Sequence, residues 1–401
     1  MSESLQVLRV SVLGATGSIG TNTLDVMARH PERYALHAIT AHRSVDAMLA
    51  LCARHRPRVA VMADESAGRQ LADRIRAEGL PVQVTWGAAA LDQVASDPEV
   101  DAVMAAIVGA AGLSPCLAAA RTGKRLLLAN KEALVVGGEV FLQAVREGGA
   151  TLLPIDSEHS AIFQSLPEDP ATWSRRIEKI ILTASGGPFR SRDPATLHQV
   201  TPEEACAHPN WRMGQKISVD SATMMNKALE VIEARYLFGV EPAQLEVVIH
   251  PQSIVHSMVQ YRDSSVVAQL GTPDMRTPIA YGLSWPERIE SGAARLDFHA
   301  LPAMTFEAID AHEHPRRFPG LALAWQTLQA RPGSCAVLNA ANEIGVAAFL
   351  SRRIRFDQIH AVNLATLDAF HEDPPRDLPD LLAIDRSSRE KASRIVAQIS
   401  A

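Results

Sequence analysis

Short apolar runs alternate with amphipathic, helix-like stretches over the first 150 residues of the chain. The apolar runs have the length and β-branched composition of buried strands, and they lie at residues 7–13, 35–40, 59–62, 82–85 and 102–105. Strands that alternate with helices predict a parallel sheet, because two parallel strands need a crossover between them. We therefore predict an α/β fold in which residues 1–150 form a Rossmann-type, doubly wound parallel sheet.

The pattern changes after residue 150. Longer irregular segments and one helical pattern, residues 222–238, separate the strand-like runs at residues 177–182, 247–249, 257–261 and 266–270. This mixture predicts an α+β domain over residues 151–285, and the motifs described below predict that it is the catalytic domain.

A long irregular segment, about residues 186–216, interrupts this second domain. Loops of such length inside a compact domain are usually lids or inserts. The segment carries Trp211 and Met213, side chains of the kind that cover a ligand and exclude water. We expect a lid, with a plain linker as the alternative.

The last part of the chain is expected to support the fold. Residues 286–318 are proline-rich and predict a linker, so we expect the sequence His312-Glu313-His314 within it to be solvated. Residues 319–401 follow an almost continuous helical pattern and predict a C-terminal α-helical bundle. Three polar residues interrupt one of its mostly apolar helices: Asn339, Asn342 and Glu343.

Composition narrows the class of protein. Hydrophobic residues make up 47% of the 401 residues and charged residues 21%, as in soluble proteins of more than one domain. The formal net charge of −6 argues against nucleic acid or an anionic membrane as the main partner. A phosphorylated ligand must therefore be held by a local cluster of side chains.

Cysteine usage and the N-terminal sequence predict a cytoplasmic protein. The four cysteines are far apart and form no C-x-x-C pair, which fits a reducing compartment and excludes a cysteine-rich zinc site: Cys52, Cys116, Cys206 and Cys335. No apolar stretch has the length of a membrane span, and the first predicted strand leaves no room for a signal peptide.

A glycine-rich turn follows the first predicted strand. It has the sequence Gly14-Ala15-Thr16-Gly17-Ser18-Ile19-Gly20 and leads into a helical pattern. Glycines let the backbone approach a pyrophosphate, and the helix N-terminus offers N–H donors. The turn predicts dinucleotide binding, although the spacing is G-x-x-G-x-x-G and a ligand-free packing turn is the alternative.

The end of the second strand predicts the choice of dinucleotide. NAD enzymes usually carry an acidic residue there, whereas this chain has Ala41-His42-Arg43-Ser44. A cation and a hydroxyl favour a 2′-phosphate, and therefore NADP.

A polar triplet, Asn130-Lys131-Glu132, follows another predicted strand, residues 125–129. The carboxyl ends of strands in an open α/β sheet are where ligands bind. We expect these residues to face a ligand; a solvated surface turn is the alternative.

The acidic sequence Asp156-Ser157-Glu158-His159 follows an apolar run that predicts a strand. In a strand, Asp156 and Glu158 would point to the same face, because side chains alternate. Two such carboxylates suit a hard cation, Mg²⁺ or Mn²⁺, better than zinc. A solvated turn is the alternative.

The helical pattern at residues 222–238 supplies a third carboxylate. Asn226, Lys227, Glu230 and Glu233 share one face by their spacing, after a predicted cap at Asp220-Ser221. In the functional interpretation, Glu230 joins the two acidic residues while polar side chains hold a phosphate: Ser221, Asn226 and Lys227. A solvated Lys–Glu pair is the alternative.

Taken together, these motifs resemble those of the 1-deoxy-D-xylulose 5-phosphate reductoisomerase family, whose members use NADPH and a divalent metal in the non-mevalonate isoprenoid route. The similarity spans the whole chain through GATGSIG, AAIVGAAGL, LLANKEALV, PIDSEH, LTASGGPFR, HPNWRMGQKISVDSATMMNKALE, HPQSIVHSMV and LNAANEIGVAAFL. One departure is His42, where many members have glycine.

The resemblance implies a role for each matching position. The implied metal ligands are Asp156, Glu158 and Glu230. The implied substrate contacts are Lys131, Ser157, Glu158, Ser185, His208, Ser221, Asn226, Lys227 and Glu230. The implied NADPH contacts are Thr16, Gly17, Ser18, Ile19, Asn130, Glu132 and Gly214, together with the strand-end residues His42, Arg43 and Ser44. Trp211 and Met213 fall on the family's mobile lid.

The resemblance also implies the reaction. A phosphorylated five-carbon ketose is cleaved between C3 and C4 in a retro-aldol step and rejoined as a branched aldehyde, which NADPH reduces. Lys131 would stabilise developing negative charge, and the metal would be Mg²⁺ or Mn²⁺, with Co²⁺ as a further option. The family further implies a homodimer.

Two rival functions remain at this point. An NADP-dependent semialdehyde or polyol dehydrogenase shares the glycine turn, but it would need a catalytic cysteine or a Lys–His–Asp set and no metal. A non-catalytic nucleotide sensor would lack the three carboxylates. An activity assay with and without EDTA separates these alternatives.

Overall fold

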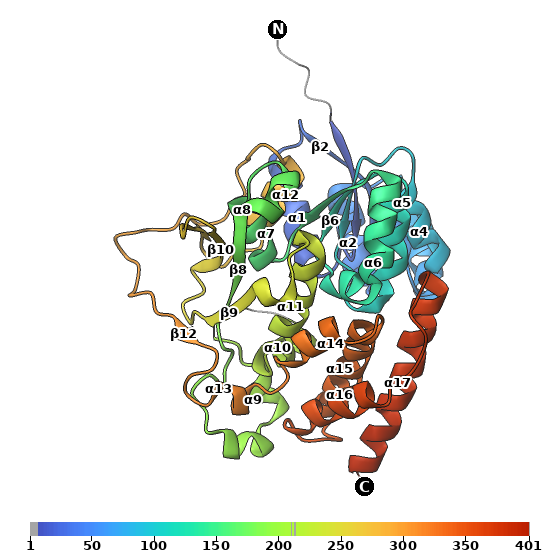
Figure 1. Ribbon diagram of the computed structural model, residues 1–401. Coiled ribbons are helices and arrows are strands. Elements are labelled where there is room, and N and C mark those ends of the chain that lie inside the picture. The colour runs from blue at the N-terminus through green and yellow to red at the C-terminus, as the bar shows by residue number, and fades with distance from the viewer. Residues whose placement is uncertain (1–6, 210, 212–213, 401) are drawn as a thin grey trace. The chain divides into compact units, whose positions relative to one another are not determined.

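The computed structural model describes residues 7–209, 211 and 214–400 (Figure 1). The chain forms two compact units. The first comprises Met1–Ala133, Phe141–Ser157 and Asp274–Ala294, and the second Leu134–Val140, Glu158–Pro273 and Arg295–Ala401. The division into three functional domains stays a prediction.

A parallel seven-stranded sheet forms the centre of the first unit, in the order β4-β3-β2-β1-β5-β6-β7. The strands are β1 (Leu8–Leu13), β2 (Tyr34–Ala41), β3 (Val59–Met62), β4 (Gln83–Trp86), β5 (Ala102–Ala105), β6 (Arg125–Leu128) and β7 (Thr151–Pro154). The predicted doubly wound sheet is therefore confirmed.

Helices connect these strands (Figure 1). They are α1 (Ser18–Arg29), α2 (Val45–His55), α3 (Glu65–Ala77), α4 (Ala88–Ser96), η1 (Ala110–Gly112), α5 (Leu113–Arg121) and α6 (Lys131–Gly148), and a later helix, α12 (Arg276–Ser284), packs against α1. The strand order reverses direction at β1. Right-handed crossovers therefore put α1 to α3 on one face and α4 to α6 on the other, and ligands bind at such a reversal.

The second unit contains a mixed five-stranded sheet in the order β11-β10-β8-β9-β12. The strands are β8 (Ile177–Ala184), β9 (Leu245–Ile249), β10 (Val255–Tyr261), β11 (Val266–Leu270) and β12 (Glu307–Ala308). Helix α11 (Met225–Phe238) packs against β8 and β9 through buried side chains such as Leu229 and Ile232. The predicted strands of the α+β domain are thus confirmed.

The other elements of the second unit are mostly helical. Before β12 they are α7 (Ser157–Ser165), η2 (Pro170–Thr172), α8 (Trp173–Arg176), η3 (Pro194–Gln199), α9 (Pro202–Cys206), α10 (Gln215–Ala222) and η4 (Pro242–Gln244). After it come α13 (His314–Arg317), α14 (Leu323–Gln329), α15 (Ser334–Leu350), α16 (Gln358–Asp368) and α17 (Leu378–Ser400). Helix α15 packs against α14, α16, α17 and α10, which confirms a C-terminal helical bundle. None of the helices in the described part of the chain is long and apolar enough to span a bilayer.

Two local predictions at the candidate site are wrong. Strand β7 ends at Pro154 and helix α7 begins at Ser157, so Glu158 lies in the first turn of a helix rather than on a strand face. Asp and Ser favour helix starts over strand interiors, which explains the change. The second error concerns Ser221, which lies in the last turn of α10 and does not cap α11. Met224 separates these two helices in a left-handed conformation with φ of 63°.

The prediction for the sequence His312-Glu313-His314 is also wrong in part. His314 is buried, stacks on Phe318 at 5.8 Å between ring centroids, and its Nε2 lies 3.1 Å from a Glu307 oxygen. The tertiary fold covers this ring because β12 and α13 bring Glu307 and Phe318 to it, which proline content alone does not reveal.

Candidate functional site

The glycine turn leads directly into helix α1 in the first unit. Gly14 has φ of 78°, and a Cβ there would lie 2.5 Å from the carbonyl oxygen of Ala106, so only glycine fits. Gly17 is the N-cap of α1, no side chain caps the helix, and its first turn contains no acidic residue. Thr16 and Ile19 are half-buried, and Ser18 is exposed. This helix N-terminus has the features of an anion-binding site.

Arg43 lies just beyond the end of β2, flanked by the exposed residues His42 and Ser44. Its Nε donates to an Asp64 oxygen at 2.9 Å, and Asp64 also accepts from the Ala67 amide at the start of α3. The Ala67 hydrogen bond and the Arg43 guanidinium hold the pKa of Asp64 below its usual range. A guanidinium thus stands at the carboxyl end of β2, where the ribose of a dinucleotide binds.

The polar triplet begins helix α6. Asn130 is its N-cap, because its side-chain oxygen accepts from the Ala133 amide at 3.2 Å, while its Nδ2 donates to the Gly109 carbonyl at 3.0 Å. Glu132 is buried. Lys131 is also buried, and its Nζ lies 2.6 Å from an Asp156 oxygen. These residues are therefore not a solvated turn.

The three predicted carboxylates lie together. One oxygen from each of Asp156, Glu158 and Glu230 is within 4.8 Å of the other two. Glu158 belongs to the first turn of α7, and Glu230 to the middle of α11. Three hard oxygen donors at this separation fit an ion of the size and chemistry of Mg²⁺ or Mn²⁺.

A buried lysine balances two of these carboxylates. The Nζ of Lys227 donates to Glu158 at 2.7 Å and also pairs with Glu230. Burial lowers the pKa of this lysine, but the two carboxylates raise it by more. The pKa of Lys227 is therefore above its usual value. The ammonium of Lys227 therefore offsets part of the negative charge of Glu158 and Glu230.

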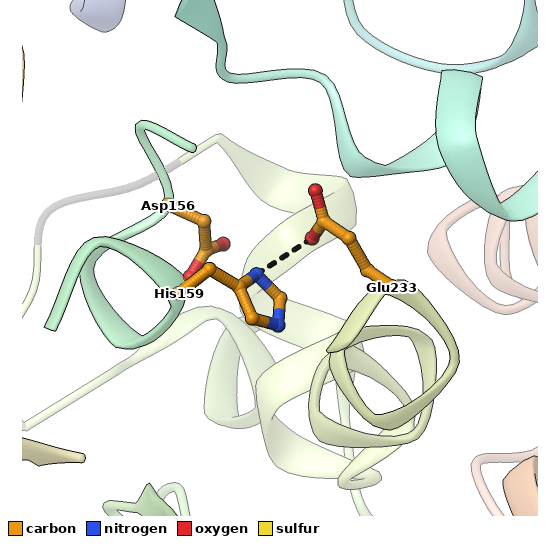
Figure 2. Close-up of side chains that lie close together, drawn as sticks. All are labelled: Asp156, His159 and Glu233. Carbon is orange, nitrogen blue, oxygen red and sulfur yellow. Dashed lines mark ion pairs between the residues drawn. The ribbon is translucent and has the colours of Figure 1, made fainter. Parts of the chain in front are cut away.

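A second pair supports the same two helices. His159 and Glu233 have fully buried side chains, and the His159 Nδ1 lies 2.8 Å from a Glu233 oxygen (Figure 2). The His159 Nε2 lies 2.9 Å from the carbonyl oxygen of Glu230. This ring therefore ties α7, which carries Glu158, to α11, which carries Glu230. Asp156 is close to the same pair, with its carboxylate within 4.8 Å (Figure 2).

Polar groups suited to a phosphate come from three segments of the second unit. The Trp211 amide donates to His208 Nδ1 at 3.0 Å, so the neutral ring carries its proton on Nε2 and donates to Ser185 Oγ at 3.1 Å. Burial lowers the pKa of His208, which favours this neutral form. The Gly187 amide also donates to Ser185 Oγ, at 3.1 Å.

The backbone brings Ser221 towards this group. A Cβ on Gly187 would lie 2.7 Å from the Ser221 carbonyl oxygen, so the β8 loop and the end of α10 are in close contact. Asn226, in the first turn of α11, donates to a Glu230 oxygen at 2.5 Å.

Three family models match the chain. The model described as 1-deoxy-D-xylulose 5-phosphate reductoisomerase matches residues 10–138, its C-terminal domain matches residues 152–238, and a further DXP reductoisomerase C-terminal domain matches residues 270–391. The chain belongs to the 1-deoxy-D-xylulose 5-phosphate reductoisomerase family.

Curated members of this family align over nearly the full length. The 1-deoxy-D-xylulose 5-phosphate reductoisomerase of Cupriavidus taiwanensis is 57% identical over 384 residues, 96% of this chain and 97% of that protein. The protein of the same name from Ralstonia nicotianae is 56% identical over 391 residues, 98% of each chain.

Solved structures of the family share the fold. The Zymomonas mobilis reductoisomerase in complex with NADPH has 46% identity and a TM-score of 0.90, with 98% of this chain and 99% of that chain covered. A DOX-P reductoisomerase in complex with NADPH, fosmidomycin and magnesium has 44% identity and a TM-score of 0.93, with 98% of each chain covered.

Three further predicted site residues, Ser157, Trp211 and Gly214, belong to the described part of the chain. Ser157 is the first residue of α7, and the exposed Gly214 is the N-cap of α10. Trp211 is half-buried, whereas Met213 lies outside the described residues. The lid therefore stays a prediction.

Sequence reasoning missed two features of the site. Glu233 was placed on the polar face of α11 without a role, although it is fully buried against His159. One signal for this role was available in the sequence. Four polar residues share one face of the predicted helix, beside a predicted strand end, and a face that only contacts solvent does not need so many. The second feature is the pairing of Lys227 with Glu158 and Glu230; its contact with a phosphate stays a prediction.

Proposed function

We propose that Asp156, Glu158 and Glu230 hold the divalent cation with which this chain converts 1-deoxy-D-xylulose 5-phosphate into 2-C-methyl-D-erythritol 4-phosphate. The conversion and its use of NADPH and a divalent metal follow from membership of the family. The observation that carries the metal assignment is the gathering of three carboxylate oxygens within 4.8 Å. The dehydrogenase alternative is not favoured by these family matches.

The donor set supports the assignment of the cation to this position. All three groups are carboxylates, which suit Mg²⁺ and Mn²⁺, and no cysteine takes part. A bound divalent cation supplies charge stabilisation for substrate oxygens. A solved relative of 44% identity is described as a complex with magnesium, NADPH and fosmidomycin.

The protein's own side chains then orient the substrate. Lys131 is held by Asp156, and its ammonium can stabilise negative charge that develops on a substrate oxygen. We assign the phosphate to a cluster that provides hydroxyl, amide and ammonium donors, with His208 fixing the Ser185 hydroxyl: Ser185, Ser221, Asn226 and Lys227. Holding the phosphate keeps the cleaved fragments oriented for rejoining.

The NADPH contacts are assigned to the first unit, except for Gly214. The uncapped N-terminus of α1, at Thr16, Gly17, Ser18 and Ile19, suits the pyrophosphate. Arg43 suits the 2′-phosphate because it is a cation at the end of β2. Asn130 and Glu132 complete the assignment at the start of α6, and Gly214 at the start of α10.

We also propose that the protein is a cytoplasmic homodimer. Strand β11 is at the edge of its sheet and pairs only with β10 among the described strands, and its Val266 and Val267 are 49% and 44% exposed. An apolar edge strand is a template for pairing with another chain. Four free cysteines support a reducing compartment.

An amide substitution series tests the metal assignment. Asp156→Asn, Glu158→Gln and Glu230→Gln keep the side-chain shape but each remove one charge, and we expect kcat to fall by about 10³ or more in each, the scale of losing a key electrostatic stabiliser. Titration calorimetry with Mn²⁺ should detect weaker binding, while NADPH affinity stays near that of the wild type.

The matched control is Glu178→Gln, an exposed carboxylate on β8, which should retain wild-type turnover. EDTA should abolish activity of the wild type and of this control, and added Mg²⁺ should restore it. Wild-type turnover and metal dependence in Glu230→Gln would show that the three-carboxylate assignment is wrong.

A further inference from the structure

Helix α15 carries two asparagines that the site described above does not use. Asn339 and Asn342 lie one turn apart and both are fully buried, although the helix is otherwise mostly apolar. A buried amide is costly unless its donors and acceptor are paired. The contacts of the two residues differ, and the difference points to a role.

Asn342 links three helices of the second unit. Its Nδ2 donates to an Asp220 oxygen of α10 at 2.7 Å, and its side-chain oxygen accepts from Asn363 of α16 at 3.3 Å. The two neighbours fix which way this amide points. Asn339 instead donates to Glu343 of its own helix at 3.1 Å.

Asp220 is a buried carboxylate at the end of α10. Only 1% of the residue is exposed, and its second oxygen pairs with Lys216, one turn earlier, at 2.8 Å. Because the Lys216 pair lies within α10, it cannot orient that helix. The Asn342 hydrogen bond comes from another helix and can orient it.

Orientation matters because Ser221 follows Asp220 directly. Helix α10 ends at Ala222, and the left-handed residue Met224 then starts α11, which carries Asn226 and Lys227. Val219 and Ala222 pack in an apolar cluster with residues of α15 such as Ala341. This apolar packing holds α10 against the bundle, and the directional Asn342 hydrogen bond restricts its rotation further.

We propose that Asn342 is a positioning residue for the substrate phosphate: through Asp220, it sets the rotation of α10 and thereby the place of the Ser221 hydroxyl. The inference rests on the proposed assignment of Ser221 to the phosphate. It gives the C-terminal bundle a part in substrate recognition in addition to its support of the fold. The ligand class concerned is a phosphate monoester.

Asn342→Ala and Asn339→Ala form a matched pair, because both remove a fully buried amide from the same helix. For Asn342→Ala we expect the KM for 1-deoxy-D-xylulose 5-phosphate to rise about tenfold, the scale of one coupled polar contact. The KM for NADPH and kcat should change by less than about twofold, as for sites without such a contact. Asn339→Ala should leave all three within about twofold.

A phosphate-free substrate isolates the effect. The turnover of 1-deoxy-D-xylulose, measured as kcat/KM, should be the same in Asn342→Ala and the wild type. Equal effects of the two asparagine variants, or an Asn342→Ala effect on both substrates alike, would overturn the inference. If Asn342→Ala does not purify in folded form, Asn342→Ser takes its place, since its hydroxyl leaves Asn363 a partner.

Ser221→Ala separates this inference from the proposed function. If Ser221→Ala raises the substrate KM and Asn342→Ala does not, the phosphate assignment stands and the positioning role fails. If Ser221→Ala leaves the KM unchanged, the assignment of Ser221 fails first. When both single variants raise the KM, the double variant should raise it by less than the product of the two single-variant increases, because both variants act through one contact.

Discussion

Buried charge distinguishes the residues of the candidate site from those of an ordinary surface. Lys131, Lys227 and Glu230 are 5%, 3% and 1% exposed, and each has an oppositely charged partner. The alternative of a solvated Lys–Glu pair on α11 is therefore wrong. Burying a charge costs free energy even when it is paired, and replacing such pairs by apolar residues often stabilises a protein. These buried charges are therefore better explained by a role in the reaction than by a contribution to the stability of the fold.

Arg43 allows a prediction about cofactor choice. The Arg43 side chain is 72% exposed, so its ion pair with Asp64 contributes little to folding. Arg43→Ala should raise the KM for NADPH by roughly 10- to 100-fold, the range of a hydrogen bond to a charged group, with a smaller change in kcat. Steady-state kinetics with NADPH and NADH measure this, because loss of the 2′-phosphate contact affects only NADPH.

Arg76→Ala is the control for Arg43→Ala. Arg76 is also an exposed arginine in an ion pair, with Asp73 on α3. This variant should keep the wild-type preference for NADPH. Equal use of NADH and NADPH by the wild type would contradict the assignment of Arg43.

Helix breaks determine where the elements of the site begin. Helix α6 begins at Lys131, directly after its N-cap Asn130. Within α6 the chain passes through Gly138 with φ of 48° and ψ of −130° and then continues as a helix. Only glycine adopts this conformation without strain, and a Cβ at this position would contact Tyr236.

Gly138→Ala should therefore destabilise the protein. A Cβ at this position would lie 3.0 Å from the Tyr236 hydroxyl, in addition to the unfavourable φ. We expect the free energy of unfolding to fall by about 2–3 kcal/mol, the upper part of the range for backbone strain. Urea unfolding followed by circular dichroism measures the change.

Gly239→Ala separates strain from crowding. Gly239 ends α11 with φ of 63°, and a Cβ added there would meet no neighbouring atom within 4 Å. This variant should cost about 1 kcal/mol, the contribution of the left-handed conformation alone. A Gly138→Ala cost no greater than that of Gly239→Ala would exclude the contact with Tyr236 as a constraint.

At the scale of the whole molecule, each unit has its own sheet, and the edges of the two sheets differ. The edge strand β4 of the first unit is short, and the side chain of its last residue, Trp86, is covered in part by Arg69. The edge strand β11 of the second unit presents Val266 and Val267 to solvent. Natural proteins usually protect such an edge with charge, proline or another chain.

A double substitution of that edge tests the proposed homodimer. Val266→Lys combined with Val267→Lys places charge where a second strand would pair, and we expect the sedimentation coefficient to fall to that of a single chain. Leu364→Lys changes a 40% exposed leucine on α16 and should leave the assembly intact. A wild-type protein that sediments as a monomer at assay concentrations would exclude the dimer.

The doubly wound sheet, the glycine turn and the residue types of the site could all be predicted from the sequence. These features depend on local chemistry: strand and helix periodicity, the glycine required at Gly14, and carboxylates that suit a hard cation. The family motifs rest on the same local residues, so they too were available without a structure.

Which of these residues lie in contact could not be predicted and depends on the three-dimensional fold. Asp220 and Asn342 are 122 positions apart, and His159 lies 71 positions from the Glu230 carbonyl that it contacts. The start of α7 at Ser157 and the break at Met224 likewise came from the structure. Periodicity identifies the buried face of an element but not its partner, because the partner depends on how all elements pack around a shared core.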